Sequence, residues 1–248
     1  MVIRTFIVNL RDDVVRRKHI NDILAIYKDS LDIEFIEAVD GRILSEEQRR
    51  GKFNVEKFET NFFRKIMPGE IGCTLSHQNI YKKIIEEKIH IALILEDDII
   101  IRENLSPLLP DIEKKLESNV PMIILLSGWF WYTKKQKFDK SHDLAKVVDG
   151  YLTHSYAINY AAAKLMHTDY PYLLADSWEK YMDNGIKIYG ITPHLIDQDW
   201  TNFQSTITGS QTRGLGLKNL QQWFNVKRRT IKQHMLEIFG LYESKSRV

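Results

Sequence analysis

The sequence has little cysteine, little net charge and no long apolar run, and each shortage excludes a class of protein. Its 248 residues contain one cysteine, Cys73, which excludes an internal disulfide and a thiolate zinc cluster and favours a reducing compartment. We interpret Cys73 as a small buried residue of a helix. No stretch approaches the roughly 20 apolar residues of a membrane span, and the first residues lack the pattern of a secretory signal. We therefore expect a cytoplasmic protein.

The net charge of +2 conceals a basic C-terminal segment. Between Arg213 and Val248 the chain has eight basic and two acidic residues, interleaved with apolar residues. This composition predicts a basic amphipathic helical segment over residues 211–248, after a domain over residues 1–210. We expect the segment to attach to an anionic membrane surface, and the alternative is a helix that packs on the domain. Its apolar content exceeds what phosphate contacts need, so we expect no nucleic-acid partner.

An acidic triplet follows the most apolar strand that the sequence predicts. Residues 91–95 are uninterrupted apolar residues, which is typical of a strand covered on both faces of an α/β sheet. Glu96, Asp97 and Asp98 come next. Ligands of open α/β sheets bind beyond the carboxyl ends of the strands, and clustered carboxylates there can hold a divalent cation that neutralises phosphate charge. The alternative is a solvated strand end.

The segment before this strand predicts a helix with polar side chains near its start. Pro68 marks the entry, and apolar residues recur at roughly helical spacing as far as Lys88. Glu70, Ser76 and His77 lie within the first turns of this helix. They supply more hydrogen-bonding groups than packing requires, so we expect some of them to belong to a site.

The beginning of the chain predicts a strand, a helix and a second strand within residues 3–39. Helical spacing in the middle of this unit indicates that Val14 and Val15 face inward. Nucleotide-binding α/β domains begin in this way, but no glycine-rich phosphate loop is present. Arg16 and Arg17 either contact a bound nucleotide or form a solvated helix face, and the residues favour neither interpretation.

Two further segments stand out for their aromatic residues. Residues 42–67 are dense in charge and contain four phenylalanines, which predicts a mobile excursion that packs through its aromatic side chains and is a candidate lid. Residues 129–132 are Trp-Phe-Trp-Tyr and follow a predicted strand over residues 122–126. Aromatic faces suit a sugar platform because they present apolar area to pyranose CH groups. The alternative is ordinary core, and we expect at least two of the four to be core.

The helix start and the acidic triplet together resemble glycosyltransferase family 25, which contains bacterial lipooligosaccharide biosynthesis proteins and collagen hydroxylysine galactosyltransferases. The resemblance rests on residues 69–77, Gly-Glu-Ile-Gly-Cys-Thr-Leu-Ser-His, followed by residues 93–98, Leu-Ile-Leu-Glu-Asp-Asp. It extends over about residues 3–210. Three shorter matches lie earlier in the chain: Asn9-Leu10, Arg16-Arg17 and Ala38-Val39-Asp40-Gly41.

This resemblance implies a fold and an activity. The fold is an α/β domain of the nucleotide-sugar transferase type called GT-A, with a mixed, mainly parallel sheet flanked by helices. The activity is an inverting, metal-dependent transfer of galactose from UDP-galactose to a glucose or N-acetylglucosamine residue of lipooligosaccharide, in the first place a β-1,4 transfer. The implied cofactor is Mn²⁺ or Mg²⁺. From the basic segment, which lies outside the resemblance, we expect the protein to be peripheral on the inner face of the bacterial inner membrane, where it would meet its glycolipid acceptor.

The resemblance also implies roles for single residues. The catalytic base is Asp176, with Glu179 as the alternative base and helix capping as the alternative role of Asp176. The metal ligands are Asp98 and His194, and the alternative for His194 is a surface loop residue. We expect Tyr156, from a Thr-x-x-Tyr-x-Ile element similar to one of the family, to bind the acceptor, together with Trp129 and Trp131 of the aromatic run. Donor-binding residues are Val8, Asn9, Leu10, Arg17, Asp40, His77, Glu96 and Asp97.

Two other functions use the same residues. A metal-dependent phosphohydrolase of nucleotide sugars would employ the carboxylates but release free sugar. A membrane-surface glycan-binding protein with a degenerate site would use the aromatic residues and the basic segment without turnover. The complete acidic triplet and Asp176 argue against degeneration.

Overall fold

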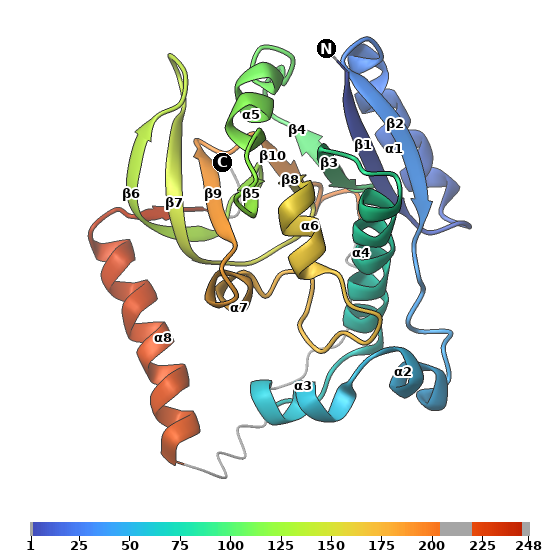
Figure 1. The fold of residues 1–248 in the computed structure, drawn as a ribbon, viewed down its shortest axis with the longest axis vertical. Coiled ribbons are helices and arrows are strands. Elements are labelled where there is room, and N and C mark those ends of the chain that lie inside the picture. Colours follow the sequence, from blue (N-terminus) through green and yellow to red (C-terminus); the bar gives the residue numbers. More distant parts are fainter. Residues whose placement is uncertain (1, 204–219, 245–248) are drawn as a thin grey trace.

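The computed structural model describes residues 2–203 and 220–244, which form a mixed sheet between two layers of helices (Figure 1). The strands are β1 (Ile3–Asn9), β2 (Leu31–Glu37), β3 (Ile91–Glu96), β4 (Ile99–Ile101), β5 (Met122–Leu125), β6 (Phe130–Lys137), β7 (Asp143–Gly150), β8 (Ser155–Asn159), β9 (Lys187–Thr192), β10 (Ile196–Gln198) and β11 (Tyr242–Glu243). The helices are α1 (Val14–Leu24), the 3-10 turn η1 (Ala25–Tyr27), α2 (Glu46–Lys52), α3 (Val55–Phe62), α4 (Pro68–Glu86), α5 (Leu109–Leu116), α6 (Tyr160–Met166), α7 (Trp178–Asp183) and α8 (Leu220–Ile238).

The large sheet has the strand order β11-β6-β7-β9-β5-β8-β3-β1-β2. β1 pairs in parallel with β2 and β3, and β5 pairs in parallel with β9. The other pairings between its described strands are antiparallel. The expectation of a mixed α/β sheet is confirmed, but the expectation of a mainly parallel one is wrong. The reason is that β8 lies between β3 and β5 and runs antiparallel to both. β7 is likewise antiparallel to both of its neighbours, β6 and β9.

The core lies on both faces of the sheet. Leu93 and Leu95 of β3 pack with residues of α1 and α5, whereas Ala92 and Ile94 pack with residues of α4 and α6. Side chains of a strand alternate between its faces, so a continuous apolar run is what a strand between two helical layers requires. Glu96, the last residue of β3, therefore lies at the carboxyl end of a central strand that helices cover on both faces.

α1 buries a different face from the one that was predicted from its two valines. Val14 and Val15 are 67% and 68% exposed, so that prediction is wrong. The helix begins only at Val14, and its buried residues are Arg16, Ile20 and Leu24, one turn apart from each other. This phase points the Arg16 side chain toward the sheet edge.

Two glycines allow the loop after β2 to touch α4. A Cβ atom at Gly41 would lie 1.8 Å from the carbonyl oxygen of Pro68, and one at Gly72 would lie 2.3 Å from the carbonyl oxygen of Val39. The Ser76 hydroxyl accepts a hydrogen bond from the Val39 amide at 2.8 Å. The loop is thus fixed against the first turns of α4 by contacts that a side chain at either glycine would break.

The excursion between β2 and α4 contains two short helices, α2 and α3, which lie below the start of α4 in Figure 1. Phe53 and Phe58 are fully buried and pack with Val55 and Ile71. Packing through aromatic side chains is therefore confirmed for these two phenylalanines. Closure of this segment as a lid stays a prediction.

The described part of the C-terminal segment packs on the domain. Figure 1 shows α8 beside the β6 edge of the sheet, and β11 pairs antiparallel with β6. Arg229 of α8 donates to both carboxylate oxygens of Asp149, and the indole N–H of Trp131 donates to Glu237 at 3.0 Å. The predicted boundary between residues 210 and 211 lies outside the described residues, as do Arg213 and Lys218. Among the described residues, no helix has the length and apolar character to cross a membrane.

Candidate active site at the carboxyl ends of β1 and β3

The acidic triplet consists of the last residue of β3, Glu96, and the two residues of the tight turn to β4, Asp97 and Asp98. Arg16 reaches it from α1, and its Nη1 atom donates to Asp97 Oδ1 at 3.0 Å and to Asp98 Oδ2 at 2.9 Å. The Asn9 amide at the end of β1 donates to Asp97 Oδ2 at 2.7 Å. The Gln198 amide of β10 donates to Asp98 Oδ2 at 2.9 Å. Three elements that are distant in sequence therefore meet at these carboxylates.

Burial makes the two aspartates hard to ionise. Desolvation raises the pKa of Asp97 to about 6, although hydrogen bonds from Asn9 and Arg16 act in the opposite direction. Desolvation also raises the pKa of Asp98, and the charge of Glu96 raises it further. One guanidinium contacts two carboxylates here, with a third carboxylate adjacent, so the cluster carries excess negative charge once all three are ionised.

A cavity of about 90 Å³ opens beside the triplet. It is lined by residues from the ends of β1, β2 and β3, from α1 and from the first turns of α4. Of the predicted donor-binding residues, five lie in its wall: Val8, Leu10, Asp40, Glu96 and Asp97. Asn9 is not part of the wall but holds Asp97, and the cavity is also lined by Arg16, Arg42 and Cys73.

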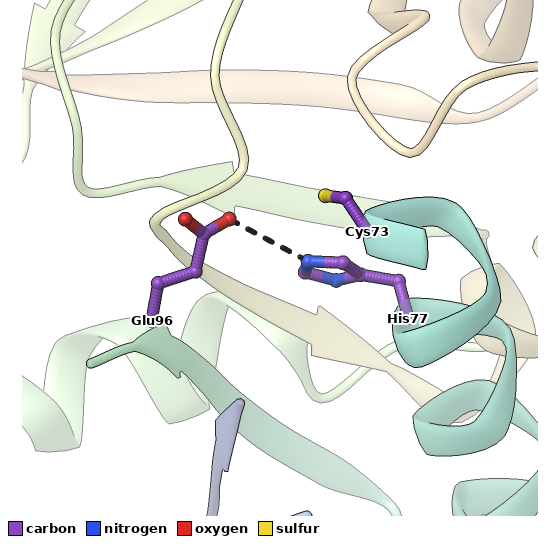
Figure 2. Close-up of side chains that lie close together, drawn as sticks. All are labelled: Cys73, His77 and Glu96. Atoms are coloured by element: carbon purple, nitrogen blue, oxygen red, sulfur yellow. Dashed lines mark ion pairs between the residues drawn. The ribbon is translucent and has the colours of Figure 1, made fainter. Parts of the chain in front are cut away.

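Glu96 is oriented by α4 and by the segment before β8. Thr153 donates to Glu96 Oε1 at 2.6 Å, and His77 Nε2 lies 3.7 Å from the same oxygen. Although burial raises the pKa of Glu96, the neighbouring His77 and the Thr153 hydroxyl lower it overall. Cys73 stands one helical turn before His77 on the same face, as Figure 2 shows. Burial raises the pKa of the Cys73 thiol well above its usual value.

Asp176 lies within electrostatic reach of this group. Its Oδ2 atom accepts a hydrogen bond from the Leu152 amide at 3.3 Å. Desolvation raises its pKa, and the charges of Glu70 and Glu96 raise it further. The N-cap residue of α7 is Ser177, so the capping alternative for Asp176 is wrong. A half-buried carboxylate with a raised pKa near the end of β3 can accept a proton.

Arg17 is not brought to the cavity. Its guanidinium lies 4.0 Å from the ring centroid of Phe35 on the exposed side of α1, and Arg16 takes the place that was predicted for it. The spacing of Arg16, Ile20 and Leu24 along one helix face is the sequence signal that could have made this distinction.

His194 is not brought to Asp98. Its ring is fully buried, with Nδ1 2.6 Å from Glu243 Oε1 and Nε2 2.7 Å from Asp197 Oδ1. Both nitrogens therefore already have carboxylate partners, so the structure does not support the prediction that His194 is a metal ligand beside Asp98. The surface-loop alternative is also wrong, since the side chain has no exposure.

The predicted acceptor residues are mostly core. Trp131 is 4% exposed and packs against Tyr242 of β11, and Tyr156 is fully buried, with its hydroxyl 2.8 Å from His77 Nδ1. Neither can touch an acceptor in this structure, because β11 covers the first and α4 covers the second. Trp129 is only partly buried and is stacked at an angle on Tyr151. Glu179, the alternative base, lies 3.7 Å from Arg229.

The acidic cluster suits a hard divalent cation. Asp98 Oδ1 is buried and has no hydrogen-bond partner among the described residues, and the donor atoms of the triplet are all oxygens. Mg²⁺ and Mn²⁺ prefer carboxylate oxygen ligands, and a divalent charge would offset the excess negative charge. Asp98 and Asp97 therefore fit such an ion without His194.

Comparison with known proteins agrees with the resemblance seen in the sequence. The model of glycosyltransferase family 25, described as an LPS biosynthesis protein family, matches residues 2–176. Procollagen galactosyltransferase 2 of Mus musculus is 31% identical over 119 residues, which cover 44% of this chain and 18% of that protein. A glycosyltransferase 25 family member of Aedes aegypti is 43% identical over 72 residues, covering 28% of this chain and 12% of that protein.

A bacterial relative is described as a putative glycosyltransferase of Haemophilus influenzae. It is 33% identical over 104 residues, which cover 42% of this chain and 35% of that protein. The chain thus spans well under half the length of the relatives that it matches. The matched residues 2–176 include the cavity wall, the acidic triplet and, at their last position, Asp176.

We expect Arg16→Met to destabilise the protein in a pH-dependent way. Removing the guanidinium leaves Asp97 and Asp98 buried without their cation, which should lower the free energy of unfolding by about 3–5 kcal/mol at about pH 8. The raised carboxyl pKa values, including the value of about 6 for Asp97, mean that protonation removes this penalty as the pH falls. Urea denaturation between about pH 4 and 8 measures the difference from wild type.

The matched control is Arg17→Met, one residue away and exposed, which should cost at most about 1 kcal/mol at any of these pH values. Equal destabilisation by the two variants, or a cost of Arg16→Met that is as large at about pH 4 as at about pH 8, would contradict the charge balance described here.

Proposed function

Because the chain belongs to glycosyltransferase family 25, we propose that it is an inverting, metal-dependent galactosyltransferase of the GT-A type. The observation that carries this proposal is the placement of the acidic triplet beside a cavity, with the proton-accepting carboxylate of Asp176 within electrostatic reach of Glu96. Donor activation and acceptor deprotonation require these two kinds of carboxylate. Galactose as the transferred sugar is supported by the galactosyltransferase named among the relatives.

The donor in this proposal is UDP-galactose, bound at the carboxyl ends of β1, β2 and β3. A cavity of about 90 Å³ is too small for a whole nucleotide sugar, so the donor would occupy it in part and extend along the strand ends. Val8, Leu10 and Val39 offer apolar contact to the base, and Arg16 and Arg42 offer positive charge to the diphosphate. A Mn²⁺ or Mg²⁺ ion at Asp98 and Asp97 would supply Lewis-acid stabilisation of the diphosphate leaving group.

The reaction in this proposal is a direct displacement. An acceptor hydroxyl attacks the anomeric carbon from the face opposite the diphosphate, and Asp176 takes the hydroxyl proton. The bond between the anomeric carbon and the diphosphate oxygen breaks, and UDP leaves with its electron pair. An α-linked donor thus gives a β-glycoside. Glu179 is a weaker candidate for the base because its carboxylate lies 3.7 Å from the Arg229 guanidinium and lines a different cavity from the one beside the acidic triplet.

The acceptor in this proposal is a glucose or N-acetylglucosamine residue of lipooligosaccharide, joined by a β-1,4 linkage. The family description, which names LPS biosynthesis, supports a glycolipid acceptor. Trp129 supports the sugar contact because its ring is partly accessible next to Tyr151. Its backbone has a φ of 67°, which is rare for a bulky residue and is the kind of local strain found at ligand-binding positions.

We expect UDP release that depends on an acceptor and on a divalent cation. The measurement is a screen of UDP-galactose, UDP-glucose, UDP-N-acetylglucosamine and UDP-N-acetylgalactosamine with Mn²⁺ or after EDTA treatment, each with and without β-glucoside and N-acetylglucosaminide acceptors. UDP release from one donor only when acceptor is present supports the transferase and identifies the sugar. Release of free sugar without acceptor favours the phosphohydrolase, and glycan binding without turnover favours the non-catalytic binding protein.

We expect Asp176→Asn to lower kcat by about 10²–10⁴-fold with little change in the KM for the donor, because the amide cannot accept the proton. Since burial raises the pKa of Asp176, kcat of the wild type should fall as the pH decreases, from a point above the ordinary carboxyl range. Glu179→Gln is the control and should change kcat only a few-fold. A large kcat loss in Glu179→Gln with a nearly unchanged Asp176→Asn would transfer the role to Glu179.

We further propose that α8 attaches the protein to an anionic membrane surface. Ile231, Met235, Ile238 and Phe239 are 54–79% exposed, and their spacing places them along one face of the helix. The exposed Arg228 and Lys232 lie on the same stretch of α8. An apolar row with adjacent basic residues is suited to the interface of an anionic bilayer, where each basic group contributes about 1 kcal/mol. The opposite side of α8 is held to the domain through Arg229 and Asp149.

We expect the double variant Ile238→Ser, Phe239→Ser to lose at least about tenfold in binding to vesicles of phosphatidylcholine with phosphatidylglycerol. Co-sedimentation measures the bound fraction, and vesicles of phosphatidylcholine alone should bind less wild-type protein. The control is Val14→Ser, Val15→Ser, which removes another exposed apolar pair, on α1. Absence of wild-type binding to anionic vesicles, or self-association through α8 measured by sedimentation, would refute membrane attachment.

A further inference from the structure

We propose that Cys73, His77 and Glu96 form a second metal site, which takes a softer divalent cation, Zn²⁺, at the inner wall of the cavity. Its ligands differ in kind from the oxygens of Asp97 and Asp98. Thiolate and imidazole ligands select Zn²⁺ over Mg²⁺ and Mn²⁺, which prefer oxygen. The site is therefore a place where a different ion can bind next to the proposed catalytic one.

The geometry of the three side chains supports this assignment. Cys73 and His77 are one turn apart on α4, so both project from the same face of the helix, and Glu96 faces them from the end of β3 (Figure 2). One ligand atom from each residue lies within 4.8 Å of the other two, and His77 Nε2 is 3.7 Å from Glu96 Oε1. Tetrahedral zinc with bonds of 2.0–2.3 Å needs ligand atoms about 3.3–3.8 Å apart. Small side-chain movements are enough to reach that spacing.

The state of the His77 ring is independent support. The ring has no exposure, yet Nε2 makes no hydrogen bond within the described part of the chain. The other nitrogen, Nδ1, lies 2.8 Å from the Tyr156 hydroxyl, which in turn lies 2.8 Å from the Tyr81 hydroxyl. Metal-bound histidines are oriented in this way, with one nitrogen held by an outer partner and the other directed at the metal. A buried polar atom without a hydrogen-bond partner is costly, and a metal would satisfy it.

The arrangement leaves one coordination position toward the cavity. Cys73 and Glu96 both line the cavity wall, whereas His77 lies behind them. Three protein ligands with a fourth position open to water or another ligand is the pattern of exchangeable and catalytic zinc sites. Binding replaces the thiol proton of Cys73 by the metal and releases that proton to solvent. It also engages the Glu96 carboxylate, which lines the cavity, so zinc should alter the wall that a donor would contact.

The first experiment tests binding without reference to enzyme activity. The metal-free full chain is titrated with Co²⁺, which occupies zinc sites and gives a thiolate charge-transfer band in the near ultraviolet when a cysteine is bound. Because Cys73 is the only cysteine of the sequence, any such band reports this residue alone. We expect one equivalent of Co²⁺ to produce the band and Zn²⁺ to displace it. Absence of the band at saturating Co²⁺ would overturn the proposal.

Variants then test the other two ligands. His77→Gln and Glu96→Gln should each weaken Zn²⁺ binding by at least about tenfold in competition with a colorimetric chelator. Cys73→Ser should abolish the Co²⁺ band, and circular dichroism shows whether each variant is folded. The control is His234→Gln, which removes an exposed histidine of α8 and should leave affinity and band unchanged. If the wild-type band persists with undiminished affinity in folded His77→Gln and Glu96→Gln, Cys73 binds metal with other partners and the site proposed here is wrong.

An activity measurement separates this site from the proposed function. Zn²⁺ at a concentration that saturates the Co²⁺-competent site should inhibit wild-type transfer at least about tenfold even in excess Mn²⁺, because Glu96 belongs to the cavity wall. A protein that binds Zn²⁺ at Cys73 but transfers no sugar would retain this inference and lose only the proposed function.

Discussion

The structure depends on the interaction of Arg16 with the carboxylates of Asp97 and Asp98. A buried strand that ends in three carboxylates places several negative charges where water is scarce, and this arrangement is tolerable only if a cation or a metal is supplied. Arg16 provides part of that charge from α1 and so fixes the helix against the turn between β3 and β4. Asn9 and Gln198 add the hydrogen bonds that the guanidinium cannot make. The same excess of negative charge that makes the turn costly makes it suited to a divalent cation.

Two different chemistries meet at the end of β3. Asp97 and Asp98 face Arg16 and offer oxygen ligands, whereas Glu96, one residue earlier, faces α4 with Cys73 and His77. Glu96 is the last residue of β3, whereas Asp97 and Asp98 belong to the turn that follows, so the three carboxylates reach two environments. Burial raises the pKa of Asp97 to about 6, while the neighbours of Glu96 keep its pKa low. The three acidic residues are thus not equivalent, although the sequence presents them as a uniform triplet.

Local patterns predicted what local physics determines. The apolar run of β3, the helix that begins at Pro68 and the carboxylates at the strand end follow from burial and capping, and the structure has them where the sequence indicated. The antiparallel position of β8 between β3 and β5 was not predictable in this way, because an apolar strand does not specify its neighbours. Choosing Arg16 over Arg17 required the helical phase of α1, which depends on where the helix starts. The pairing of His194 with Glu243 joins segments that are distant in sequence, so no local sequence pattern could have predicted it.

The pairing of β11 with β6 has a consequence for how the chain folds. Trp131 finds its strand partner, Tyr242, only near the other end of the chain, so this contact has a very high sequence separation and should form late. Until then β6 is an uncovered edge strand, and uncovered edges invite pairing with other chains. The exposed half of β6 carries three lysines, at residues 134, 135 and 137, and their charge repulsion would discourage such pairing. Charge on this half of the strand is thus a means of keeping a temporarily uncovered sheet edge from pairing with another chain.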